Sequence, residues 1–244
     1  MAPIGDARSK GPRGFYLVTA VHAAQDTHAR TRILYRDADG SSQWIHLGAL
    51  TAKEGDPWFN HENSDLAIMR VARLEAHARQ VDQLATLSIP LDSLLREAPP
   101  RTAEIEIVGF PMALGTQPSV SPLVMKGSLA SREMLTEAKW GLEPILFAVP
   151  VVGAGCSGGP VFQSRSRNLS RCPSCGAAAP GSADSVTGSQ SATAEDDLQV
   201  VGMYVGLQFD ATGVKLAKIV PARVIRAALC RAAAKPSARA DSSK

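Results

Sequence analysis

Short apolar runs, separated by glycine, proline and polar turn residues, recur along most of the chain. Runs of this kind are typical of β-strands in proteins built mainly from sheets. Strands are expected at residues 15–20, 30–36, 43–47, 65–71, 104–108, 123–131, 144–152, 160–163, 199–207 and 214–220. The turn-rich segment 37–42 joins the second and third of these strands into a hairpin. The pattern predicts an all-β barrel or sandwich.

Helical periodicity is clear only near the end of the chain. Pro221 is expected to begin a helix, because proline is tolerated at the first helical position. Its apolar face consists of Val224, Ile225, Ala228 and Leu229. A second, short helix is expected from Asp92, as its cap, through Glu97.

Three segments lack the apolar residues of a folded core. Residues 1–14 and 235–244 are polar and are expected to form flexible tails. Residues 164–197 are rich in Ser, Ala and Gly and contain no aromatic residue. They are expected to be a disordered insertion in a hairpin loop, because they bury too little to fold alone.

Charge and composition narrow the class of protein. The 244-residue chain has a net charge of +3, but residues 1–14 and 231–244 carry +2 and +3, which leaves the middle at about −2. This distribution argues against a nucleic-acid-binding face. We find no signal peptide or membrane-spanning run, and four cysteines do not indicate a disulfide framework, so a cytoplasmic location without membrane contact is expected.

The segment Gly155-Cys156-Ser157-Gly158-Gly159-Pro160 follows one expected strand and precedes another. It reads either as a glycine-rich turn or as a nucleophile with a backbone oxyanion hole. All five histidines precede Ser157, which excludes the α/β-hydrolase order of serine, acid and histidine. A subtilisin-like order needs an acid before the histidine, and the only one before His22 is Asp6, in the polar tail. The remaining order is histidine, aspartate, serine, and His22 and Asp65 fill it at the ends of apolar strands.

At these three places the chain resembles the chymotrypsin-like (trypsin-fold) serine proteases. The histidine motif is Thr19-Ala20-Val21-His22-Ala23-Ala24, the aspartate motif is Ser64-Asp65-Leu66-Ala67-Ile68-Met69, and the serine motif is the glycine-rich segment above. The chain is most similar to bacterial, non-secreted trypsin-like peptidase domains. The resemblance implies two antiparallel six-stranded β-barrels, at residues 15–100 and 101–234, the second including the C-terminal helix.

The resemblance also implies the chemistry of the site. His22 would be the general base, Asp65 would orient it, and Ser157 would attack a peptide carbonyl held by the N–H groups of Gly155 and Ser157. A protein or peptide substrate is expected, with no cofactor. Val151, six positions before the serine, stands where a trypsin carries an acid, which argues against cleavage after Lys or Arg.

Several alternatives stay open at this point. The family has a further strand ahead of the one leading to the histidine, where this chain has polar residues 1–14, which leaves open an incomplete first barrel. Cys156 is a candidate nucleophile in place of Ser157. Cys172 and Cys175 form half of a zinc site, and the other half would have to come from another subunit. A peptide- or protein-binding module with little activity is the alternative function.

Overall fold

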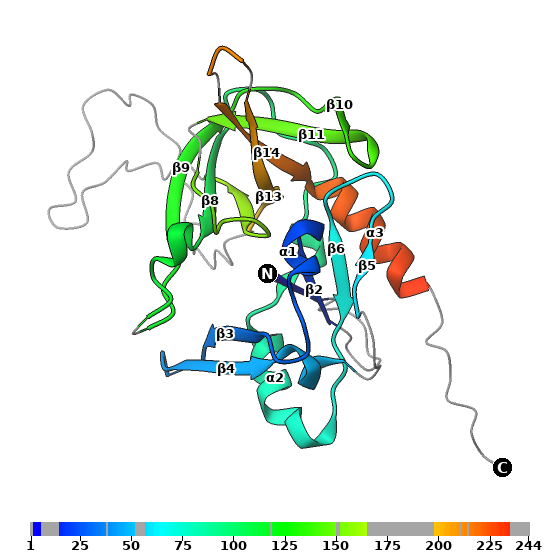
Figure 1. The fold of residues 1–244 in the computed structure, drawn as a ribbon, viewed down its shortest axis with the longest axis vertical. Helices are drawn as coiled ribbons and strands as arrows, with labels where there is room; N and C mark the ends of the chain where they lie inside the picture. The colour runs from blue at the N-terminus through cyan, green and yellow to red at the C-terminus, as the bar shows by residue number, and fades with distance from the viewer. Residues whose placement is uncertain are drawn as a thin grey trace, which may run out of the picture.

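The computed structural model describes residues 2–5, 15–37, 39–51, 57–117, 119–149, 152–164, 198–209, 211–213 and 215–234. The expected insertion at 164–197 beyond Ser164 and the C-terminal tail at 235–244 lie outside these residues, as do Val151, Cys172 and Cys175. The fold is mostly antiparallel β-sheet, in two groups of strands with a helix across their junction (Figure 1).

The first group of strands contains a five-stranded sheet and a separate hairpin. The sheet has the order β5-β6-β2-β1-β7 and the hairpin is β3-β4. The bounds are β1 Ala2–Gly5, β2 Phe15–Thr19, β3 Arg32–Arg36, β4 Ser42–His46, β5 Phe59–Asn60, β6 Ala67–Arg70 and β7 Ile89–Pro90. Between the described residues, no strand pairing closes this group into a ring.

The second group of strands closes into a barrel. Its order is β10-β11-β14-β13-β12-β8-β9, and β9 also pairs with β11, so that six strands form a ring and β10 extends it. The bounds are β8 Glu104–Gly109, β9 Leu123–Leu129, β10 Met134–Ala138, β11 Gly141–Val149, β12 Pro160–Gln163, β13 Val200–Phe209 and β14 Lys215–Pro221. The expected six-stranded antiparallel barrel is thus present in the second half.

Among the described residues, three short helices accompany the strands. They are α1 Val21–Gln25, α2 Ala78–Thr86 and α3 Ala222–Ala234. The 3₁₀ turns are η1 Leu47–Leu50, η2 Glu75–His77, η3 Leu91–Ser93 and η4 Pro111–Ala113. Among the described residues, no helix is both long and apolar enough to cross a membrane.

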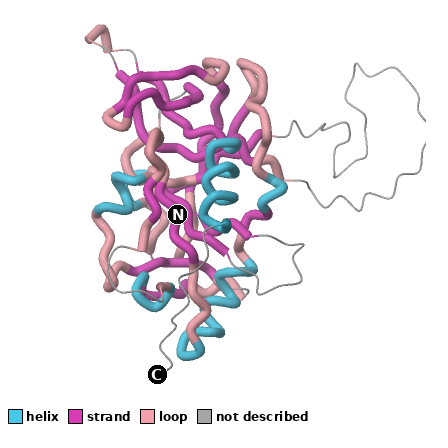
Figure 2. Tube along the Cα trace, turned by 90° about the vertical axis from the view of Figure 1, so that its right-hand side faces the viewer, coloured by secondary structure: helices cyan, strands magenta, loops and turns pink. Residues whose placement is uncertain are grey.

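The C-terminal helix α3 joins the two groups of strands. Its expected apolar face, Val224, Ile225, Ala228 and Leu229, is buried, with each residue at most 5% exposed. That face packs in one cluster with Val18, Leu66 and Ile68 of the first group and with Ile145 and Met203 of the second. Figure 2 shows α3 facing the viewer across this junction. Two further clusters fill the first and second groups separately.

The structure differs from the sequence prediction in several places. Residues 2–5, expected within a tail, form β1, which pairs with β2 and supplies a strand ahead of the one leading to His22. Helix α2 was not expected, although its buried Val81 and Leu84 lie three positions apart on one face. The helix expected at 92–97 is instead the single turn η3.

Candidate active site

His22 and Asp65 come together because β2 and β6 are antiparallel neighbours. Thr19, at the end of β2, is paired with Ala67, at the start of β6. The chain therefore leaves β2 for α1 at the place where it enters β6. Val21 and Ala24 are buried, so His22 between them faces outward. Its Nδ1 lies 2.6 Å from Oδ2 of Asp65, and its backbone N–H donates to Oδ1 over 3.2 Å.

The electrostatics of this pair favour a charged histidine beside a charged carboxylate. The hydrogen bond that His22 donates to Asp65 raises the pKa of His22 above its usual value, against the lowering effect of partial burial. Burial alone would raise the pKa of Asp65, but the hydrogen bond and charge of His22 hold it below the usual range. The backbone N–H groups of His22 and Val21 act in the same direction.

The Ser157 loop is held by the second barrel and rests against the end of β2. The N–H of Gly158 donates to the carbonyl of Tyr204 over 2.8 Å, and the Tyr204 hydroxyl donates to the carbonyl of Val152 over 3.0 Å. Gly158 has a φ of 84°, and a Cβ there would overlap the Thr19 side chain. Since Thr19 is three residues before His22, this contact brings the Ser157 loop beside the histidine.

Ser157 itself is partly exposed and is not bonded to the histidine. Within the described part of the chain, the hydrogen bonds of His22 both go to Asp65 and none joins it to the Ser157 hydroxyl. Such contacts between a nucleophile and its base are often long in the absence of substrate and tighten when substrate binds. The structure thus brings His22 and Asp65 into direct contact and places the Ser157 loop next to them.

Gly155 has a backbone conformation and surroundings that only glycine fits. Its φ is 98°, and a Cβ would overlap the carbonyl oxygen of Phe110. The adjoining turn is braced by the N–H of Met112, which donates to the carbonyl of Ala154 over 2.8 Å. In the described ranges, the N–H groups of Gly155 and Ser157 have no acceptor. Both are therefore available to bind a negatively charged oxygen.

Cys156 faces the interior of the second barrel. Its side chain is 1% exposed, and burial raises the pKa of its thiol. A Cβ added to Gly109 would lie 2.9 Å from the Cys156 sulfur, so the thiol fills the space beside β8. A buried thiol with a raised pKa is a poor nucleophile, because the thiolate is the reactive form. This placement favours Ser157 over Cys156.

Sequence reasoning missed two features that support the site. One is the 110–113 segment, where Met112 and Ala113 have φ values of 53° and 59°, uncommon for residues with a Cβ. The other is Glu143, which is fully buried and accepts a hydrogen bond from the backbone of Asp65. A carboxylate inside an apolar run was the available signal, but the expected strand began at residue 144 and left it out.

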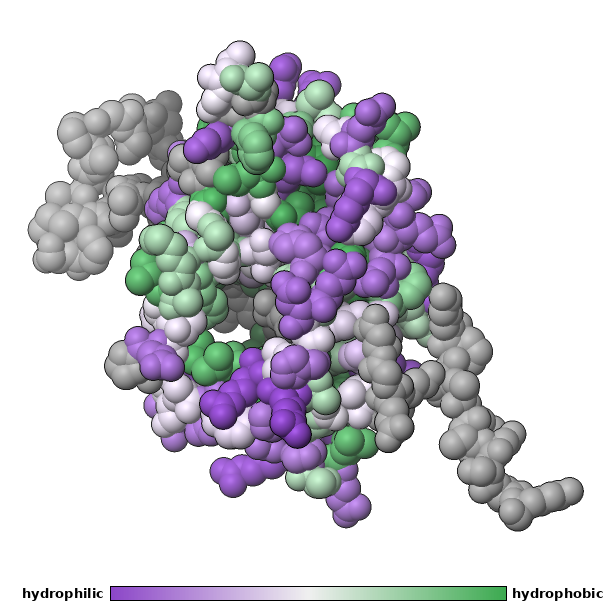
Figure 3. All heavy atoms as spheres, in the orientation of Figure 1, coloured by the Kyte–Doolittle hydropathy of each residue, from purple (hydrophilic) through white to green (hydrophobic). Residues whose placement is uncertain are grey.

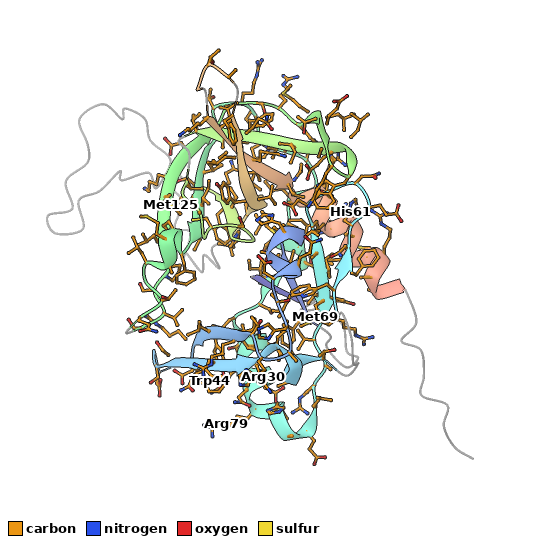
Figure 4. All side chains as sticks on the ribbon, viewed as in Figure 1. Arg30, Trp44, His61, Met69, Arg79 and Met125 are labelled. Atoms are coloured by element: carbon orange, nitrogen blue, oxygen red, sulfur yellow. The ribbon has the colours of Figure 1, made fainter. Side chains whose placement is uncertain are left out.

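The loop that carries Asp65 is also attached to α3. His61, labelled in Figure 4, lies beside α3, and the Arg231 guanidinium is 2.9 Å from its Nε2. Burial and the charge of Arg231 lower the pKa of His61, in the direction opposite to that of His22. No group of three or more possible metal ligands occurs among the residues that the structure describes.

An apolar hollow opens between the two groups of strands, beside the segment that borders Gly155 (Figure 3). It has a volume of about 310 Å³. Its walls come from β2, β3, α2 and the segment 110–122, and include Leu17, Ile33, Leu84 and Phe110. Phe110 thus lines the hollow and also borders Gly155 with its carbonyl oxygen.

Comparison with known proteins places the fold among serine proteases. No family model and no curated protein matches the sequence. The MamO protease domain from Magnetospirillum magneticum is 13% identical, with a TM-score of 0.50 and 93% of each chain covered. An inactive serine-to-alanine variant of Rv3671c from M. tuberculosis is 12% identical, with a TM-score of 0.51 over 92% of this chain and 83% of that one.

A third solved structure is less similar. The HtrA-type protease AlgW, with a decapeptide, is 14% identical at a TM-score of 0.47, and the match covers 88% of this chain and 48% of that one. The first two likenesses, together with the strand order, show that the chain has the trypsin-like fold of serine protease domains.

Proposed function

We propose that the chain is a serine endopeptidase that cleaves peptide bonds through Ser157, His22 and Asp65. The observation that carries this proposal is the 2.6 Å contact between His22 Nδ1 and Asp65 Oδ2, beside a serine loop packed on the same strand end. The fold is shared with protease domains, one of which is the MamO protease domain. Fold alone does not give function, so the proposal rests on the site.

The contacts of His22 determine how it would act. An ionised carboxylate only accepts hydrogen bonds, so the proton of this contact lies on Nδ1 of His22. Nε2 is then free to accept the proton of Ser157 as its oxygen attacks the carbonyl. The imidazolium that forms is stabilised by Asp65, and it returns the proton to the leaving amine.

The negative charge that develops on the substrate oxygen would be taken up by the N–H groups of Gly155 and Ser157. Both groups are fixed in direction before substrate arrives, because the 155 turn is held by Met112 and the 157 loop by Tyr204. The acyl-enzyme would then be hydrolysed by water with His22 again as base. Val151 supports a preference for small or apolar side chains before the cleaved bond, rather than Lys or Arg.

Labelling with a fluorophosphonate probe tests the proposal directly. We expect wild-type protein to be labelled at Ser157, and labelling to fall by about 10⁴-fold or more in Ser157→Ala and in His22→Ala. Ser93→Ala, a change in another serine outside the site, is the matched control and should be labelled normally. Cys156→Ala should also keep its labelling, which tests the cysteine alternative.

Two results would overturn this function. Labelling that persists in Ser157→Ala would assign the nucleophile elsewhere. Wild-type protein that unfolds cooperatively yet is never labelled would favour the peptide-binding module, and binding of extended peptides without cleavage would then establish it.

A further inference from the structure

Buried polar side chains gather at one place in this molecule. Among the described residues, the buried polar or charged side chains are Thr19, Ser64 and Glu143, at 1%, 0% and 0% exposure. Thr19 packs against the Ser157 loop, and Ser64 precedes Asp65. Burying a polar group is costly unless its hydrogen bonds are made. The contacts of Thr19 with the Ser157 loop and of Ser64 with Glu143 each join one group of strands to the other, so all three residues lie at the junction around the candidate site.

Glu143 reaches from the second group of strands into the first. It lies on β11, and its Oε1 accepts a hydrogen bond of 2.8 Å from the backbone N–H of Asp65 and one of 3.2 Å from the Ser64 hydroxyl. Its Oε2 lies 3.5 Å from Nζ of Lys218 on β14. The Lys218 side chain is 18% exposed, so this ion pair is itself largely removed from water.

A buried ion pair is weak grounds for stability, because desolvation offsets much of the attraction between its charges. The contribution of Glu143 is instead to fix the position of the Asp65 backbone. Asp65 is held at its backbone by Glu143 and at its carboxylate by His22. The same β11 strand belongs to the barrel that carries the Ser157 loop.

We propose that Glu143 is a positioning residue that fixes Asp65, and through it His22, relative to the barrel that presents Ser157. This inference rests on the proposed function, since it assigns Glu143 a part in the same reaction. A misplacement of about 1 Å in such a site can cost about 100-fold in rate. Among the described residues, the Glu143 side chain forms hydrogen bonds or ion pairs with Ser64, Asp65 and Lys218 and not with Ser157 or His22, so it acts through Asp65.

The test is a charge-neutral double variant, Glu143→Leu with Lys218→Met, which removes both buried charges and both acceptor oxygens. We expect fluorophosphonate labelling and kcat to fall by about 100-fold with KM little changed. Glu143→Gln keeps an oxygen for Asp65 and Ser64 and should recover most of the rate. Thermal unfolding of each variant checks that the protein is folded.

The matched control lies on the same barrel. Glu106 has partners of the same kinds, the Ser164 hydroxyl at 3.3 Å and Lys126 Nζ at 3.8 Å, but it is on β8, and neither His22 nor Asp65 is among its contacts. Glu106→Leu with Lys126→Met should leave the labelling rate unchanged. An equal loss of rate in this control would show that the effect is structural and would overturn the inference.

A second readout does not depend on activity. In a Ser157→Ala background, the pKa of His22 is measured by NMR titration. We expect the Glu143→Leu, Lys218→Met pair to lower this pKa towards the ordinary histidine value, because Asp65 no longer holds its place. An unchanged pKa would contradict the inference. If wild-type protein is never labelled, the proposed function fails while this titration still decides the role of Glu143.

Discussion

The two groups of strands deliver their parts of the site in different ways. The first group, open among its described strands, presents side chains, and His22 and Asp65 bond to each other directly. The second group is a closed ring and presents backbone, as the N–H groups of Gly155 and Ser157 on a loop braced by hydrogen bonds. A closed barrel suits the oxyanion hole that we propose, because such a hole needs donors that do not move.

After removal of the Ser157 or His22 side chain itself, the largest expected effect comes from disturbing the backbone part of this comparison. Gly155→Ala puts a methyl group against the carbonyl of Phe110 and turns the Gly155 N–H away. Loss of one oxyanion donor costs about 100- to 1,000-fold in rate. We expect the fluorophosphonate labelling rate to fall by that amount, while the pKa of His22, measured by NMR, stays as in wild type.

Gly141 provides a control with the same backbone conformation. It also has a φ of 98°, but a Cβ there meets nothing within 4 Å. Gly141→Ala should therefore carry the backbone strain, of about 1–2 kcal/mol, without the steric overlap. If both variants lose activity equally, strain rather than the oxyanion turn explains the loss.

The sequence predicts the site residues that stand in a local pattern, but not those that depend on contacts between distant parts of the chain. His22, Asp65 and Ser157 each stand in a local pattern of a strand end or a glycine turn, which is visible in a few residues. Glu143 could not be assigned, because its partners Ser64 and Asp65 lie 79 and 78 residues away in the chain. Their contact depends on how the two groups of strands are packed.

The strands were likewise predicted only where a local pattern marks them. The ring strands were expected within a few residues of their observed bounds, because their burial leaves apolar runs. Strand β1 was missed because its neighbours are polar and its pairing with β2 and β7 is made through the backbone. Strand β10 was missed because it lies outside the ring and exposes Met134 and Leu135, so no buried face marks it.

The helix that joins the two groups gives the next prediction. Leu229 on α3 lies in the cluster shared by both groups, whereas Leu50 lies in the cluster of the first group. Both side chains are buried, so each Leu→Ala change should lower the free energy of unfolding by about 2–5 kcal/mol. Only Leu229→Ala should also slow labelling in folded protein, since His22 and Ser157 come from the two groups of strands that this cluster joins.

Chemical denaturation and labelling below the unfolding transition provide the two measurements. Equal slowing by Leu50→Ala would mean that the site depends on general stability rather than on the junction. Unfolding of Leu229→Ala in two separate transitions would instead show that α3 is what makes the two groups one cooperative unit.

The smallest expected effect concerns the pH at which His22 loses its proton. In the proposed reaction His22 must be neutral to act as the base. Its pKa is raised, so labelling should increase with pH through a midpoint above 6.5. The effect on the free energy of unfolding has the opposite sign. Because the pKa of His22 is higher in the folded than in the unfolded protein, protonated His22 stabilises the folded state at pH values below 6.5. This stabilisation is lost as the pH rises through the pKa that His22 has in the folded state.

Lys139, in the exposed turn between β10 and β11, acts on His22 from the second group of strands. Its charge lowers the pKa of His22, while the charges of Asp65 and Asp26 raise it. Lys139→Met should therefore move the midpoint of the labelling profile to slightly higher pH and leave the plateau unchanged. The shift should shrink with added salt, because exposed charges are screened. The control is Lys126, an exposed lysine on β9 that is not among the charges acting on His22. Lys126→Met should leave the midpoint of the labelling profile unchanged. A midpoint that moves to lower pH in Lys139→Met would contradict the role given to Lys139.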